Sequence, residues 1–131
     1  MKKLIFITLL FVSSLYATLV NVYPSQELLD KKIPIVDIRT PTEWKETGVL
    51  KGAIPIMFFN ESGNYDVNAW LKELNEKVDT TKEFALICHV GNRTQIVSSF
   101  LSEKLGYKVI NLLGGMNYAQ AQNLPILPYK K

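Results

Sequence analysis

The chain has one cysteine, Cys88, and the segments around it suit nucleophilic chemistry. The apolar run 84–87 leads into Cys88 and is typical of a buried strand, while the amphipathic stretch after it predicts a helix. In open α/β sheets, ligands bind at the edge where strands end. Amides at a helix start favour a thiolate over a thiol and attract anions. One loop would therefore combine a nucleophile with an anion cradle.

Two neighbours strengthen this interpretation of Cys88. Gly91 has no Cβ, so the loop backbone can curl towards a ligand, and Arg93 places a cation near the thiol. The alternative is that Cys88 is only a small core residue, which is the commoner use of an unpaired cysteine at the end of an apolar strand.

Apolar runs and helical periodicities alternate along the chain and predict an α/β fold. Strands are expected at 19–22, 33–38, 53–56, 84–88 and 107–113. Helices are expected at 26–30, 40–48, 66–78, after the Cys88 loop as far as 106, and at 114–122, with an extended C-terminal end. This alternation predicts a small parallel β-sheet flanked by helices on both faces.

Capping residues and an apolar face define two of these helices. Thr40 and Glu43 form a capping box, with Pro41 at the first helical position. The helix that follows Cys88 is expected to end at Gly106. Its predicted buried face consists of Ile96, Val97, Phe100, Leu101 and Leu105.

Residues 1–17 are expected to be a secretory signal peptide. Lys2 and Lys3 precede the apolar stretch 4–12, and a polar-to-small segment ends at Ala17, where we expect cleavage. The alternative is a retained N-terminal anchor, although the apolar stretch is too short to span a bilayer comfortably. We therefore expect residues 18–131 to be a single periplasmic or secreted domain without a membrane span.

Charge and composition argue against two classes of partner. The formal net charge of +3 includes Lys2 and Lys3, so the mature chain carries only +1, and its scattered basic residues give no reason to expect a nucleic-acid partner. One cysteine and one histidine are too few for a usual soft-metal site, and we predict no metal and no other cofactor. Within the chain, Cys88 has no second cysteine with which to form a disulfide.

Four segments resemble, in order, the motifs of the rhodanese family of sulfurtransferases. They are Val36-Asp37-Ile38-Arg39 with Glu43, Gly48 to Ile56 with its Gly52-Ala53-Ile54-Pro55, the loop Cys88 to Arg93, and Gly114-Gly115-Met116 with Leu124-Pro125. The resemblance implies a small parallel sheet wrapped by helices, which agrees with the alternation of the predicted elements.

The resemblance also implies a reaction. Cys88 would attack the outer sulfur of thiosulfate or polysulfide, hold it as a persulfide and pass it to cyanide, a thiol or another thiophilic acceptor. The substrate cradle would be formed by His89, Val90, Gly91, Asn92 and Arg93. Within this cradle, the side chain of Arg93 is expected to steady an anionic donor, and His89, a loop-lining or exposed side chain, is not expected to act as a base.

Three further residues are expected to support the site rather than react. The resemblance assigns Asp37, Arg39 and Glu43 to structural roles and leads us to expect an ion pair between Arg39 and Glu43. The chain departs from the family at Tyr118, where a tryptophan is frequent, and at His89, where thiosulfate-selective members often have a basic residue. The preferred donor therefore stays open, as does the oligomeric state.

Alternative functions follow from the same loop. Cysteine-dependent phosphatases place the arginine six positions after the cysteine, whereas Arg93 is five positions after Cys88, so the shorter loop resembles that of the sulfur-transferring branch. The main alternative is a non-enzymatic sulfur carrier that relays a persulfide to a partner redox protein. An inert interaction domain is disfavoured because Cys88 is present.

Overall fold

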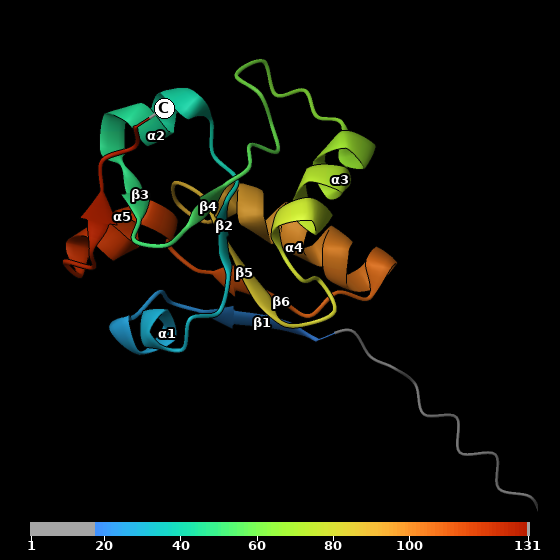
Figure 1. Cartoon of the computed structure of the whole chain (residues 1–131), viewed down its shortest axis with the longest axis horizontal. Helices are drawn as coiled ribbons and strands as arrows, with labels where there is room; N and C mark the ends of the chain where they lie inside the picture. The colour runs from blue at the N-terminus through green and yellow to red at the C-terminus, as the bar shows by residue number, and fades with distance from the viewer. Residues whose placement is uncertain (1–17, 131) are drawn as a thin grey trace, which may run out of the picture.

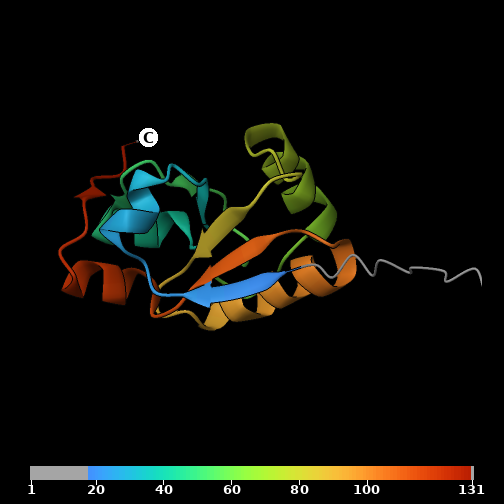
Figure 2. The same cartoon turned by 90° about the horizontal axis from the view of Figure 1, so that it is seen from below.

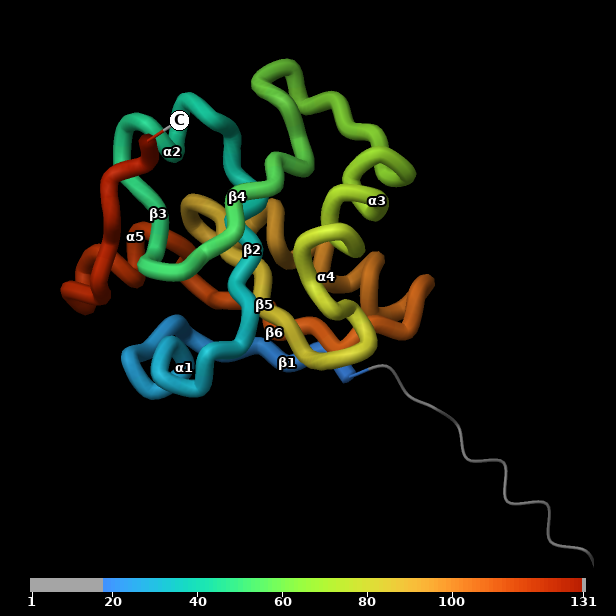
Figure 3. Tube along the Cα trace, in the orientation of Figure 1, coloured from blue at the N-terminus to red at the C-terminus, as the bar shows by residue number. Residues whose placement is uncertain are grey.

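A parallel β-sheet forms the middle of the protein. The computed structural model describes residues 18–130 (Figure 1). Within these residues, five strands form the sheet in the order β1–β6–β5–β2–β4. The strands are β1 (Leu19–Val22), β6 (Val109–Leu112), β5 (Phe84–Ile87), β2 (Ile35–Asp37) and β4 (Ile54–Pro55). In Figure 3 these strands lie side by side in this order, from β1 at one edge of the sheet to β4 at the other.

Helices cover both faces of this sheet, as predicted. In the described residues they are α1 (Gln26–Asp30), α2 (Pro41–Thr47), α3 (Val67–Lys77), α4 (Asn92–Leu105) and α5 (Gly115–Ala121). Trp70 of α3 and Leu101 of α4 share one core cluster, whereas Leu28 of α1 and Met116 of α5 belong to the cluster on the opposite face. Figure 2 shows α4 running alongside the strands, with α1 and α5 at the other end of the molecule.

The strand sequences match their depth in the sheet. Every residue of β5 and β6 is buried, because neighbouring strands and helices on both faces exclude water. Their apolar runs are therefore nearly continuous rather than alternating. β4 is an edge strand, a position that tolerates Pro55, which has no N–H to donate to a neighbour.

The C-terminal end is more ordered than an extended tail. It forms β7 (Ile126–Leu127), which pairs antiparallel with β3 (Val49–Leu50) in a second, two-stranded sheet. Gly48 makes this approach possible, since a Cβ at its position would lie 2.5 Å from the carbonyl oxygen of Leu127. The pairing joins the chain end to the segment that follows α2.

The predicted apolar face of α4 is wrong at two positions. Ile96 is 65% exposed and Leu105 is 39% exposed. The buried face instead includes the small polar residues Thr94, Ser98 and Ser102 together with Val97 and Leu101. Successive helix residues are about 100° apart, so Ile96 lies about 160° around the helix from both Thr94 and Ser98, and burying those two leaves it outside.

The signal-peptide prediction falls on residues 1–17, which lie outside the described residues. Among residues 18–130, no helix has both the length and the apolar character needed to cross a membrane.

Candidate functional site

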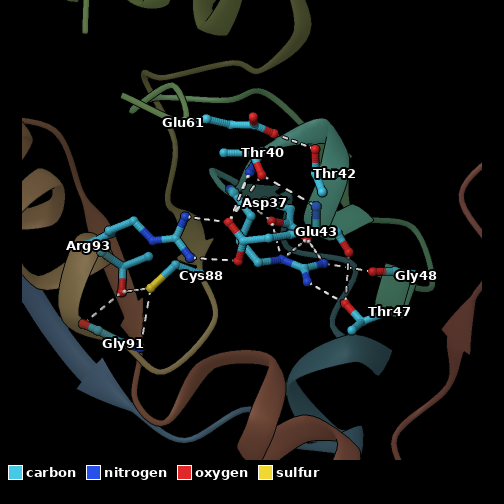
Figure 4. Close-up of polar contacts among 12 residues, drawn as sticks. Asp37, Thr40, Thr42, Glu43, Thr47, Gly48, Glu61, Cys88, Gly91 and Arg93 are labelled. Carbon is cyan, nitrogen blue, oxygen red and sulfur yellow. Dashed lines mark hydrogen bonds and ion pairs between the residues drawn. The ribbon is translucent and has the colours of Figure 1, made fainter. Parts of the chain in front are cut away.

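Cys88 lies directly after β5, at the edge of the sheet where the strands end. Its side chain is almost fully buried. Gly91 then turns the chain with a φ of 100°, a left-handed conformation that favours glycine, and α4 begins at Asn92. The turn brings the Gly91 N–H towards Cys88, with 3.2 Å between the amide nitrogen and Sγ (Figure 4). Cys88 thus lies between a strand and a helix N-terminus, as the sequence predicted.

Thr94 is a side chain that the sequence analysis missed. It is fully buried, and the Cys88 thiol donates to its hydroxyl with Sγ and Oγ1 3.6 Å apart. The hydroxyl in turn donates to the carbonyl of Gly91, at 3.2 Å. Side chains of a helix point back towards its N-terminus, so a hydroxyl in the first turn of α4 was a usable signal.

Arg93 forms an ion pair with Glu43, 50 positions earlier in the sequence. Its Nη1 and Nη2 donate to the two carboxylate oxygens at 2.7 and 2.8 Å. The hydrogen bonds from Arg93 lower the pKa of Glu43 to about 2, helped by the charge of Arg93 and the Thr40 amide, although burial works in the opposite direction. The same hydrogen bonds raise the pKa of Arg93. This pair ties α2 to the loop that carries the cysteine.

The expected pair between Arg39 and Glu43 is therefore wrong. Arg39 is buried and binds Asp37 instead, with Nε 3.0 Å from Oδ1 and Nη2 2.8 Å from Oδ2. Its remaining donors reach the Thr47 hydroxyl and the Gly48 carbonyl. The physical reason is proximity, since Asp37 is two residues away and the turn after β2 folds Arg39 back onto it. These contacts hold the end of β2 to the end of α2, so Arg39 and Asp37 connect two elements next to the site and form no hydrogen bond with Cys88 in the described structure.

Glu43 can serve two partners because a carboxylate has two oxygens. The capping box with Thr40 that the sequence predicted is present at the start of α2. Oε1 accepts from the amide and the hydroxyl of Thr40 and from Arg93, while Oε2 accepts only from Arg93 among the described residues. The cap thus orients the carboxylate that receives the guanidinium.

The remaining cradle residues contribute mainly through their backbone. His89, Val90 and Asn92 have exposed side chains. The carbonyls of Cys88 and His89 accept hydrogen bonds from the amides of Met116 and Asn117, the second and third residues of α5, at 2.8 and 3.1 Å. Among the amides of residues 89–93, that of Gly91 alone is hydrogen-bonded to Sγ in the described structure.

Gly115 permits the close approach of α5 to this loop. Its φ is +56°, and a Cβ there would overlap the Cys88 carbonyl oxygen and lie 2.6 Å from the carbonyl carbon of His89. The double glycine, which the sequence marked as the start of a helix and as part of the resemblance, thus has a physical role. It lets α5 hydrogen-bond to the loop, which α4 continues.

The electrostatics of the loop are nearly neutral. Arg93 is the only arginine, lysine or acidic residue from 88 to 93, and Glu43 balances its charge. The described residues hold no group of three metal-ligating side chains. The arrangement presents a buried sulfur to a helix start, with an amide and a hydroxyl beside it. The hydroxyl can donate to the sulfur or accept from it, whereas the amide can only donate.

Residues 25–122, more than half of the chain, match the family model described as the rhodanese-like domain. The chain belongs to the rhodanese-like domain family. The resemblance noted in the sequence is thereby confirmed, as is the predicted fold of a parallel sheet between helices.

Related proteins agree with this membership. The chain is 32% identical over 85 residues to "Uncharacterized protein RP600" of Rickettsia prowazekii, a match that spans 62% of this chain and 66% of that protein, just under two thirds of its length. It is 29% identical over 96 residues to "Putative sulfurtransferase YtwF" of Bacillus subtilis, spanning 73% of this chain and 82% of that protein. The crystal structure of Rv0390 from M. tuberculosis shares the fold, with a TM-score of 0.67 and 21% identity over 83% of this chain and 97% of that one.

Proposed function

We propose that this rhodanese-like chain is a sulfurtransferase that carries sulfane sulfur on Cys88. The observation that carries the proposal is the position of Sγ, which lies at the end of β5 and accepts the Gly91 N–H at a helix start. Family membership and the similarity to a protein named as a sulfurtransferase support it. The family match covers α4 and α5, the two helices that hold the loop.

The reaction has two halves. In the first, the Cys88 thiolate attacks the outer sulfur of thiosulfate or polysulfide, an Sγ–S bond forms, and the donor S–S bond breaks with its electron pair leaving on sulfite or the shorter polysulfide. In the second half, cyanide or a thiolate attacks the outer sulfur of the persulfide, and Cys88 leaves as a thiolate. No metal or other cofactor takes part in either half.

Arg93 has a positioning role in this proposal. Since Glu43 already binds both of its terminal nitrogens, the donor meets the loop amides rather than an unpaired guanidinium. Its five-residue spacing from Cys88 also makes the loop tight, so we expect sulfur transfer rather than hydrolysis of aryl phosphates.

The test is the intact mass of the protein after incubation with polysulfide or thiosulfate. We expect one added sulfur atom, which dithiothreitol removes, and we expect thiocyanate to form on addition of cyanide. Cys88→Ser should do neither. A Cys88→Ser protein that still accepts sulfur would contradict the assignment.

The amount of thiocyanate formed over time separates an enzyme from a carrier. Repeated turnover with a small acceptor supports the enzyme, whereas stoichiometric loading followed by slow release would support a persulfide relay to a redox partner. We also propose export with cleavage after Ala17, on the basis of the N-terminal pattern alone. The N-terminal residue of the secreted or periplasmic protein tests it.

A further inference from the structure

The hydroxyl of Thr94 lies between Cys88 Sγ and the carbonyl of Gly91, and the direction of its hydrogen bonds depends on the charge of the sulfur. Oγ1 is 3.6 Å from Sγ and 3.2 Å from the carbonyl oxygen of Gly91. When the sulfur carries a proton, the thiol donates to Thr94 and the hydroxyl donates to Gly91. Because Thr94 is fully buried, water does not compete for either contact.

A charged sulfur reverses these demands. A thiolate has no proton to give and needs donors, and the Gly91 N–H is already one of them. The Thr94 hydroxyl can rotate about its C–O bond and donate to Sγ instead. The carbonyl of Gly91 keeps a partner after this rotation, since the amide of Gln95 donates to it at 3.2 Å. The rotation therefore leaves no buried group unpaired.

We propose that Thr94 is a catalytic residue of sulfur transfer. Its hydroxyl donates to Cys88 Sγ while Sγ acts as the leaving group, as the acceptor takes the outer sulfur of the persulfide. The inference rests on the proposed function. As the acceptor attacks, its lone pair forms a bond to the outer sulfur, the Sγ–S bond breaks, and the electron pair passes to Sγ. The Thr94 hydroxyl and the Gly91 amide then donate hydrogen bonds to Sγ and stabilise its negative charge, and no oxidant or reductant is needed.

The two halves of the reaction respond to Thr94 in different ways. A hydrogen bond that lowers the basicity of Sγ makes it a better leaving group and a weaker nucleophile. At a pH where the thiol is fully ionised, removing the hydroxyl should slow the release of sulfur but leave its uptake equal or faster. A residue that only held the loop in place would slow both.

The experiment measures each half in a single turnover. For uptake, the reduced protein is mixed with polysulfide and the persulfide is followed by intact mass. For release, the loaded and desalted protein is mixed with cyanide and thiocyanate is measured. We expect Thr94→Val to release sulfur roughly tenfold more slowly, since one hydrogen bond to a charged group is lost. Thr94→Ser should recover most of the rate.

Ser98 offers a matched control. It lies one turn further along the buried face of α4, and its hydroxyl has no hydrogen-bond partner in the described structure. Ser98→Ala should therefore keep the parent rates in both halves. If Thr94→Val fails to fold, as judged by circular dichroism, Thr94→Ala is measured in its place.

The outcomes distinguish this inference from the function on which it rests. Release at the parent rate, or equal slowing of uptake and release, overturns the role of Thr94. A parent protein that takes up no sulfur, or a Cys88→Ser protein that does, overturns the proposed function instead.

Discussion

At the scale of single residues, the ion pair of Glu43 and Arg93 determines whether the guanidinium beside the cysteine loop is paired or free. The pair is three-quarters buried and bidentate, so the guanidinium is held in one orientation by two charge-assisted hydrogen bonds. The anionic donor that we propose then meets a neutral ion pair and the loop amides. Through this pair, Arg93 ties the start of α4 and the loop before it to α2.

Replacing Glu43 with glutamine should destabilise the protein at neutral pH by about 1–2 kcal/mol, since a partly buried pair keeps its geometry but loses one charge. Pairing holds the pKa of Glu43 at about 2 rather than 4.5. The stabilisation is therefore complete above about pH 4.5 and is lost as the pH falls towards 2. Urea unfolding should show the parent losing more stability than the variant in this range.

The exposed pair of Glu73 and Lys77 on α3 provides the control for this prediction. Glu73→Gln should change the free energy of unfolding by no more than about 0.5 kcal/mol, because solvent screens an exposed helical pair. If Glu43→Gln were no more destabilising than Glu73→Gln, the pair would not be holding the loop.

At the scale of elements, the start of α5 supports the loop from a distant part of the chain. The amides of its second and third residues donate to the carbonyls of Cys88 and His89, and Gly115 lets the two backbones meet. The loop is thus fixed by α5 on one side and by α4 on the other. Precise placement of Sγ depends on both contacts.

Gly115→Ala should destabilise the protein by about 3 kcal/mol, because the added Cβ overlaps two backbone carbonyls and forces the backbone of the loop or of α5 to shift. It should also slow sulfur uptake, since displacements near 1 Å cost about a hundredfold in rate. Thermal unfolding and single-turnover loading measure the two effects.

Gly63→Ala separates the clash from the cost of the left-handed backbone. Gly63 has a φ of +79°, but a Cβ there would contact nothing within 4 Å. We expect a loss of only about 1 kcal/mol and unchanged sulfur uptake. Equal effects of the two substitutions would show that α5 does not position the loop through Gly115.

At the scale of the whole molecule, the two core clusters lie on opposite faces of one sheet. Val36 and Leu86 belong to one cluster, while Ile35 and Ile87, from the same two strands, belong to the other. Neither cluster can open without exposing the strands that support its counterpart. The described residues should therefore unfold as one cooperative unit.

The two tryptophans allow this cooperativity to be measured. Trp70 packs in the cluster beneath α3 and α4, whereas Trp44 on α2 contacts Tyr129 near the C-terminus, and both are buried. In Trp44→Phe and Trp70→Phe, the remaining tryptophan reports on one region. Within each variant, fluorescence and circular dichroism should give coincident urea transitions. A fluorescence midpoint that departs from the circular dichroism midpoint would indicate two independent units.

Local sequence patterns account for most of the secondary structure and for the place of Cys88. Apolar runs, the capping box at Thr40 and the helix-ending Gly106 depend on residues a few positions apart, so they can be recognised without the fold. The buried face of α4 was harder to predict, because Thr94 and Ser98 are polar and Ile96 is not. Burial there follows from which side of the helix the sheet lies on, and only the packed structure decides that.

Long-range partners were decided by the tertiary structure. Nothing local indicates that Glu43 binds Arg93 rather than Arg39, that β3 pairs with β7, or that α5 meets the cysteine loop. Each of these contacts joins residues far apart in the chain, and its geometry depends on how the strands are ordered in the sheet. The sequence was enough to determine a strand, a nucleophile and a helix start in succession. Which carboxylate pairs with Arg93 depended on the order β5–β2–β4, which brings α2 beside the loop.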